Sequence, residues 1–186
     1  MPPTRGTPEG HEQMETRRVV LLVGSGVAAV VLAAGFLVGI LASTGGDTSR
    51  QEGVARRGAR VMPFDLDATT HAFDSTKRGG VQTVVADRPE DADQVALVRS
   101  HLRTERDRFS AGDFGDPAEV HGHGMPGLEV LEARSDALVI TYVDVPAGGR
   151  VTYRSDDQSV VAALHDWFAA QLADHGRHAT GAATSD

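Results

Sequence analysis

The chain has 186 residues, a formal net charge of −8 and no cysteine. The absence of cysteine excludes disulfides, thiolate nucleophiles and thiolate metal sites, and the acidic balance argues against nucleic acid as a partner. Since about 60 N-terminal residues cannot join a globular core, the remainder is enough for one modest domain.

The first element in chain order is an apolar segment, Val19 to Ala42, without a charged residue. At about 1.5 Å per residue, a helix of this length exceeds the roughly 30 Å hydrocarbon core of a bilayer. Arg17 and Arg18 directly precede it, which by the positive-inside rule places residues 1–18 in the cytoplasm. The sequence therefore predicts a single-pass protein of the cytoplasmic membrane with its domain outside. A cleaved signal peptide is the rival interpretation, and the length of the run disfavours it.

Residues 43–60 are rich in Gly, Ser, Thr and Arg and hold almost no large apolar side chain. Such a segment cannot bury enough surface to fold, so we expect a flexible linker. The folded domain should span residues 61–178, and the small, polar residues 179–186 should form a disordered tail.

The domain should open with a β-hairpin whose strands are Thr70–Ser75 and Val81–Asp87, joined by a turn at Lys77–Gly80. A helix then starts at Pro89 and runs to about Ser110, with apolar residues at helical spacing. Its charged residues, Glu105 among them, are expected to face solvent. Residues 111–127 contain several Gly and two Pro and are expected to be irregular.

Three further strands are expected at Leu128–Ala133, Leu138–Val145 and Arg150–Arg154, the last two joined as a hairpin by Pro146–Gly149. A closing helix, capped by Asp156 or Asp157, should run from Gln158 to about Asp174. Both faces of Leu138–Val145 are apolar, which indicates a central strand covered on both sides. The order is β-β-α, loop, β-β-β-α, which predicts an α+β domain with a mostly antiparallel sheet and helices on one face. In the closing helix, Phe168 should face the core and Trp167 should pack at its edge.

Histidine is the residue type that most suggests a site. His121, His123 and Met125 alternate, so in extended backbone two imidazoles and a thioether would point the same way and suit copper; zinc, with His165 or His71 added, comes second. The competing interpretation is that these are turn residues and partly buried structural histidines.

Several motifs from Met62 onward carry a resemblance to a family of small bacterial proteins often labelled aspartate carbamoyltransferase. They are Met62–Leu66 with His71, Gly79–Gln82, Arg99–Leu102, His121–Gly122, Met125–Leu128, Ala163–Phe168 and Asp174–Gly176. The label implies a carbamoyl-phosphate loop in a two-domain α/β enzyme. Here the nearest stretch, Ser75–Gly79, falls in the expected hairpin turn, so transferase activity is not expected.

Three functions remain open from the sequence. The leading one is an extracytoplasmic binding or accessory domain in which His71, His101, His121, His123 and His165 gather near one edge, with copper or another transition metal as ligand. The second is an interaction module of a membrane complex with structural histidines. The third and weakest is an enzyme in which a histidine and a nearby aspartate, such as Asp166 or Asp116, act as acid and base. A homodimer is a further possibility, because Gly35 and Gly39 have the small-xxx-small spacing of paired membrane helices.

Overall fold

The computed structural model describes residue 46 and residues 48–181. The predicted cytoplasmic tail and membrane helix lie outside these residues. Among the residues described, no helix is both long enough and apolar enough to cross a bilayer.

Residues 48–61 form a helix, where the sequence predicted a flexible linker over 43–60. The prediction was wrong because this segment is stabilised by the rest of the domain and not by its own apolar content. Val54 is only 2% exposed, and Arg50 reaches Asp174 with a nitrogen–oxygen distance of 2.5 Å. One buried side chain and one ion pair thus tie a polar helix to the domain.

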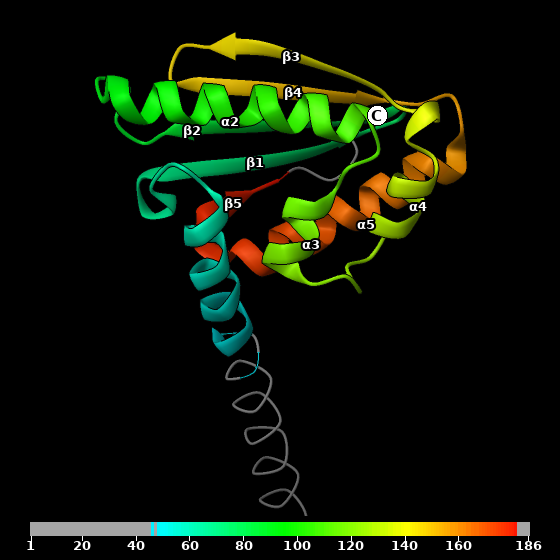
Figure 1. The fold of residues 1–186 in the computed structure, drawn as a ribbon, viewed down its shortest axis with the longest axis horizontal. Helices are drawn as coiled ribbons and strands as arrows, with labels where there is room; N and C mark the ends of the chain where they lie inside the picture. Colours follow the sequence, from blue (N-terminus) through cyan, green and yellow to red (C-terminus); the bar gives the residue numbers. More distant parts are fainter. Residues whose placement is uncertain (1–45, 47, 182–186) are drawn as a thin grey trace, which may run out of the picture. The chain divides into compact units, whose positions relative to one another are not determined.

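The sheet has five strands in the order β3-β4-β2-β1-β5. Two hairpins provide four of them: β1 (Thr69–Thr76) with β2 (Gly79–Ala86), and β3 (Val139–Val145) with β4 (Gly148–Arg154). Antiparallel pairing of β2 with β4 joins the hairpins (Figure 1). Both hairpins were predicted, since each turn is marked by Gly or Pro between β-branched runs. The α+β class and the mostly antiparallel sheet are confirmed.

The fifth strand comes from an unexpected place. β5 (Ala179–Thr180) follows the short η3 helix (Gly176–His178) and pairs in parallel with β1. The prediction of a disordered tail over 179–186 is therefore wrong at its first two residues, and residues 182–186 lie outside the part that the structure describes. Backbone pairing along a free strand edge explains how so polar a segment is held.

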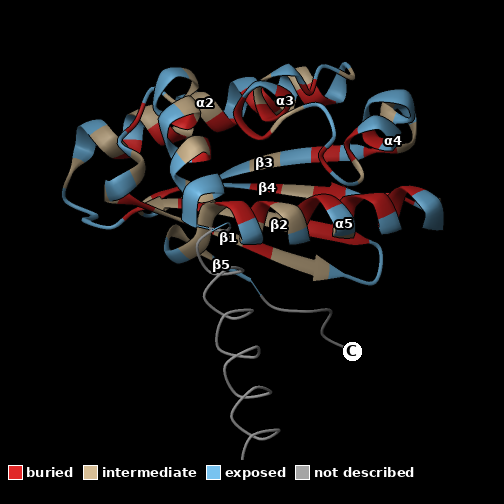
Figure 2. Cartoon of the chain, turned by 90° about the horizontal axis from the view of Figure 1, so that it is seen from below, coloured by how far each residue is buried: buried red, intermediate tan, exposed pale blue. Residues whose placement is uncertain are grey.

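Two strand predictions in the second half were wrong. Leu128–Ala133 forms the helix α4, which buries Leu128 and Leu131, two residues separated by three positions as on one helix face. β3 is an edge strand, not a central one, and Val139 is 62% exposed. Figure 2 shows this strand mostly exposed. Its doubly apolar pattern reflects an uncovered face of valines and not burial on both sides.

Three α-helices complete the domain around the sheet. α2 (Ala92–Ser110) starts at Asp91, whose carboxylate accepts a hydrogen bond from the backbone N–H of Gln94. α5 (Gln158–His175) starts in the same way at Asp157. Side-chain caps of this kind satisfy N–H groups that the first turn leaves free. The predicted irregular stretch contains α3 (Gly115–His121), and the single turns η1 (Leu66–Ala68) and η2 (Ser135–Ala137) precede β1 and β3.

α2 and α5 cover the same face of the sheet. Gly80 and Val84 point to one side of β2, and Val84 pairs with Gly149 of β4. A Cβ atom at Gly80 would meet the ring of Phe168 from α5, and one at Gly149 would meet Leu102 from α2. Both close approaches depend on glycine, which has no side chain to separate helix from strand.

The aromatic core lies between this face and the helices. Trp167 and Phe168 are each 1% exposed, so the expectation that Trp167 packs at an edge was wrong. Trp167 contacts the rings of Phe109, Phe114 and Tyr153 in edge-to-face geometry. Adjacent residues of α5 are both buried because α5 has the sheet on one side and α3 with α4 beside it (Figure 1).

Candidate functional site

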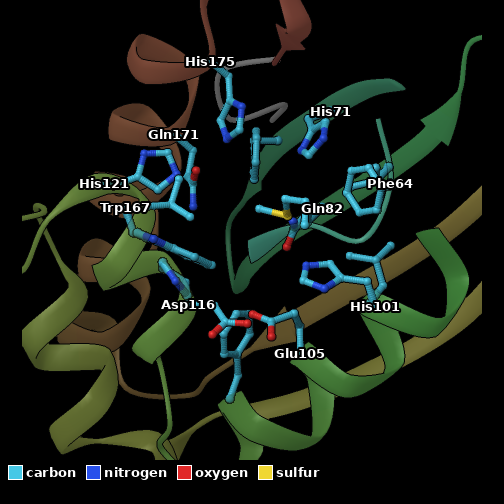
Figure 3. Close-up of a pocket in the computed structure, with 17 residues that line it drawn as sticks. Phe64, His71, Gln82, His101, Glu105, Asp116, His121, Trp167, Gln171 and His175 are labelled. Atoms are coloured by element: carbon cyan, nitrogen blue, oxygen red, sulfur yellow. The ribbon is translucent and has the colours of Figure 1, made fainter. Parts of the chain in front are cut away.

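A pocket between α2, α3, α5 and the first hairpin gathers most of the buried polar side chains. It holds about 470 Å³ of space free of protein atoms, part of it open to solvent. Figure 3 shows imidazoles at one end and carboxyl groups at the other. We call it the histidine pocket and define it by the polar side chains of His71, Gln82, His101, Glu105, Asp116, His121, Trp167, Gln171 and His175.

His121, at the C-terminal end of α3, contacts a buried carboxylate in this part of the domain. Its Nδ1 lies 2.9 Å from Oδ2 of Asp174, and both side chains are almost completely buried. Arg50 donates hydrogen bonds to both oxygens of the same carboxylate, at 2.5 and 2.8 Å. This chain of contacts fixes the orientation of the imidazole and leaves Nε2 as its other functional nitrogen.

Burial controls the charges of this group. Burial lowers the pKa of His121, and the hydrogen bond and charge of Asp174 oppose that shift without reversing it. Burial alone would raise the pKa of Asp174, but the hydrogen bonds from Arg50 and His121 outweigh it and lower that pKa. At neutral pH the imidazole is therefore neutral, and the carboxylate is charged and balanced by Arg50.

Two more imidazoles stack beside His121. The rings of His71 and His175 lie 4.9 Å apart at 24°, and the rings of His175 and His121 lie 5.2 Å apart. Burial is the main cause that lowers the pKa of His71 to about 4, and it lowers the pKa of His175 well below its ordinary value. His101 lies against the ring of Phe64, and burial lowers its pKa too. Neutral imidazoles offer a ligand both donors and acceptors.

The opposite end of the pocket holds a pair of carboxyl groups. Glu105, on α2, is hydrogen-bonded to Asp116, on α3, and burial with this neighbour raises the pKa of Glu105 to about 8. Arg108 approaches Asp116 at 2.5 Å and Glu105 at 3.4 Å. Glu105 is therefore protonated at neutral pH, while Asp116 is paired with a guanidinium.

Three buried polar atoms in the pocket make no hydrogen bond within the described part of the chain. They are Nε2 of His71, Nε1 of Trp167 and Oε1 of Gln171. A buried polar atom without a partner costs about 1–3 kcal/mol, so native proteins satisfy nearly all of them with protein, water or ligand. Three such atoms line this one pocket.

The sequence-predicted metal ligands are only partly brought together. His71, His101 and His121 line the pocket, whereas His123 is exposed and Met125 is buried in the apolar core. His165 approaches the carbonyl oxygens of Thr76 and Gly79 at the first hairpin, at 3.1 and 2.9 Å. The extended backbone assumed for the alternating motif is absent, because α3 runs through His121 and turns follow it.

Over residues 48–181 no three His, Asp or Glu side chains are placed to hold a metal ion. Sequence reasoning also missed Glu105, Gln171 and His175 as pocket residues. A signal for Glu105 was present, since it continues the helical spacing of Val98, Leu102 and Phe109 and so belongs to the buried stripe. Gln171 gave a similar signal, four residues after Trp167.

Comparison of the chain with protein-family models, with curated proteins and with solved structures gives no match. The family resemblance of residues 62–178 therefore stays a prediction. The function has to be argued from the pocket itself.

Proposed function

We propose that the domain binds a small polar molecule in the histidine pocket. The observation that carries this proposal is the set of three unpartnered buried atoms, on His71, Trp167 and Gln171. A cavity that served packing alone would be lined by apolar atoms, since an isolated buried polar group costs stability. Polar groups converging in an otherwise aromatic pocket are typical of ligand sites.

The charges around the pocket are largely balanced before a molecule binds. The two formal charges at each end are paired, Arg50 with Asp174 and Arg108 with Asp116. Lowered histidine pKa values keep the imidazoles neutral at pH 7. A free transition metal is a less suitable ligand, because stacked rings do not direct their nitrogens to one point.

For the setting, we propose that residues 19–42 anchor the domain at the outer face of the cytoplasmic membrane. The support is the uncharged length of this segment and the two arginines before it. A C-terminal reporter active only outside the cytoplasm is the expected result. Activity of the same fusion only in the cytosol would contradict it.

The binding proposal is tested on full-length protein in detergent or nanodiscs with the variant Gln171→Leu. Because Gln171 is buried and its Oε1 is unpartnered, the apolar isostere should leave the ligand-free protein equally stable or more stable. It should also abolish the stabilisation that a bound small molecule gives. The matched control on the same helix is Gln158→Leu, at an exposed position.

Two measurements read out this test: the midpoint of thermal unfolding, and the fluorescence of Trp167, which is the only tryptophan in the chain. Fluorescence should change when a molecule from a panel of small polar compounds enters the pocket. If Gln171→Leu destabilises the ligand-free protein by more than about 1 kcal/mol, the amide is structural and the proposal fails. If compounds bind the variant as well as the native protein, the pocket is not their site.

A second candidate function is acid–base catalysis on the molecule that binds. The specific observation is the buried His121–Asp174 contact in the same pocket as Glu105, whose pKa is about 8. An oriented neutral imidazole can accept a proton, and a protonated carboxyl can donate one. The aspartate partner is Asp174; Asp166, one of the two suggested by sequence, is exposed. Turnover of a bound compound that is lost in His121→Gln, with binding retained, would establish this function.

A further inference from the structure

We propose that the ligand of the histidine pocket is a small organic cation, a protonated amine that also carries a hydrogen-bond acceptor such as a hydroxyl group. This inference rests on the proposed function, because it names the class of molecule for the same pocket. Three independent features support it: the aromatic walls, the carboxyl pair and the chemistry of the unpartnered atoms.

Aromatic rings form much of the pocket wall. Phe64, Phe73, Phe109 and Trp167 all line it. The ring of Phe109 stands perpendicular to that of Trp167, with 5.9 Å between centroids, so these two walls are held in a fixed orientation. Ring faces carry partial negative charge and attract ammonium groups, and sets of such rings are used to recognise quaternary and alkylated amines.

The carboxyl groups provide an ionic partner at one end of the same pocket (Figure 3). Glu105 is almost fully buried, 5% exposed, and has one strong neighbour of like charge in Asp116. A proton on Glu105 relieves this repulsion in the empty pocket. A bound ammonium group can relieve the same repulsion in place of the proton. The proton of Glu105 then leaves to solvent, and the ammonium group pairs with the carboxylate that forms.

The unpartnered atoms match an amine with an acceptor. Oε1 of Gln171 can only accept a hydrogen bond, and Nε1 of Trp167 can only donate one. Nε2 of His71 accepts when the neutral ring carries its proton on Nδ1. An ammonium group can donate to the carboxylate at one end of the pocket, while a hydroxyl group of the same ligand can donate to Gln171 and accept from the indole N–H.

An anion fits the same pocket poorly. Its negative charge would be added to Asp116 and to a carboxyl group of Glu105, and compensation would require a buried imidazole to gain a proton. The pKa of His71 is about 4, so its protonation is unfavourable at neutral pH. The net charge of −8 also attracts cations to the chain in general.

Proton release on binding gives the inference a pH signature. The groups that face Glu105 are Arg108 and His101 on its own helix, Asp113 and Asp116 around the start of α3, and Tyr153 from β4. Arg108 stays charged, His101 and Tyr153 stay neutral near pH 7, and Asp113 stays ionised. Glu105 is then the group that titrates between pH 6 and 8, because its pKa is about 8.

The experiment uses full-length protein in nanodiscs and three small two-carbon probes of different charge: ethanolamine, ethylene glycol and glycolate. Trp167 fluorescence reports binding. We expect ethanolamine to bind at least tenfold more tightly than ethylene glycol, and glycolate not to bind. Below pH 8, the affinity for ethanolamine should increase about tenfold for each unit by which the pH is raised, because binding requires ionised Glu105. The amine itself stays protonated to about pH 9.

The variant Glu105→Gln keeps the shape of the side chain but cannot ionise. It should lower ethanolamine affinity at least tenfold and remove the pH dependence, whereas the exposed control Glu119→Gln should change neither. Equal binding of ethylene glycol, or binding of glycolate, would overturn the cation assignment while the binding proposal stands. Failure of ethanolamine to bind would overturn it as well, and the Gln171→Leu stability test would still decide the binding proposal separately.

Discussion

Nδ1 of His121 lies 2.9 Å from Oδ2 of Asp174, and both side chains are almost fully withdrawn from solvent. The two residues come from different helices, α3 and α5, so their contact exists only in the folded domain. Because Arg50 holds the same carboxylate, the helix over 48–61 takes part in positioning this imidazole. The contact connects the segment nearest to the predicted membrane anchor with the histidine pocket.

Replacing Asp174 by Asn should lower the pKa of His121 further below its ordinary value. The carboxylate raises that pKa through its hydrogen bond and its charge, while Arg50 lowers it, and only the first influence is removed. Titration of the histidine ring signals by NMR measures the change. Asp166→Asn, on an exposed position of the same helix, should have no effect. A His121 pKa that rises in Asp174→Asn would contradict the proposed charge state.

Between about pH 6.5 and 8, Glu105 should make the native protein lose stability relative to Glu105→Gln as the pH rises. The pKa of Glu105 is raised in the folded state to about 8, so the folded state holds a proton that the unfolded state has lost, and this stabilisation disappears as the pH rises through the folded pKa. The loss should be about 2 kcal/mol over this window. Denaturation at a series of pH values checks it. Glu105→Gln should flatten the profile, and an unchanged slope would sink the assignment.

Lowering the pH below about 6.5 should destabilise the folded protein through its buried histidines. The pKa of His71 is lowered in the folded state to about 4, so between about 4 and 6.5 the unfolded chain binds a proton that the folded one does not. Stability should therefore fall as the pH drops through this window, by up to about 3 kcal/mol from His71 alone. His71→Gln, which cannot be protonated, should lose less stability than the native protein between pH 6.5 and 4. Equal losses in the two proteins would show that His71 is already charged.

Two glycines in the turns before α4 make a matched pair. Gly127 has φ +76°, and a Cβ there would lie 1.9 Å from the carbonyl oxygen of Ala163. Gly124 has nothing within 4 Å of such an atom. We expect Gly127→Ala to destabilise the domain by more than about 3 kcal/mol, because the backbone must move, and Gly124→Ala to change stability by less than about 1 kcal/mol. Thermal or denaturant unfolding distinguishes them, and similar stabilities would contradict the contact with α5.

The helix over 48–61 should detach when its one fully buried apolar side chain is shortened. Val54→Ala removes two methyl groups from a nearly unexposed position and should cost about 2 kcal/mol. Limited proteolysis of full-length protein should then cut near this helix faster than in the native chain. Arg56→Ala, at an exposed position of the same helix, is the control. Equal cleavage rates in the two variants would mean that Val54 does not anchor the helix.

Local sequence signals predicted the parts of the fold that local chemistry determines. Gly and Pro at the hairpin turns and Asp91 and Asp157 at the helix starts identified both hairpins and both long helices. The errors lie where contacts with segments distant in the sequence determine the local structure. Residues 48–61 are held to the domain by the buried side chain of Val54 and by the ion pair of Arg50 with Asp174, a residue far away in the sequence. No periodicity in a polar segment reveals such partners.

The prediction of the site was likewise right where residue content was enough and wrong where the three-dimensional position of a side chain mattered. Histidine content indicated a polar site, and three of the named histidines do line one pocket. Spacing along the chain could not say that His123 points to solvent while Met125 enters the core, because that depends on where α3 ends. Glu105 was placed on the solvated side from its charged neighbours, although its spacing from Leu102 and Phe109 belonged to the buried stripe. For Glu105, helical spacing indicated burial correctly, whereas the charges of its neighbours indicated exposure.

Pairing of Ala179 and Thr180 with β1 has a consequence for the order in which the chain can mature. β1 is synthesised well before β5, the strand that closes its outer edge. A nascent chain thus carries an open edge beside His71 until residues 179 and 180 have been synthesised. Truncation at residue 178 would leave that edge permanently available to neighbouring chains, so short C-terminal deletions should favour association through it.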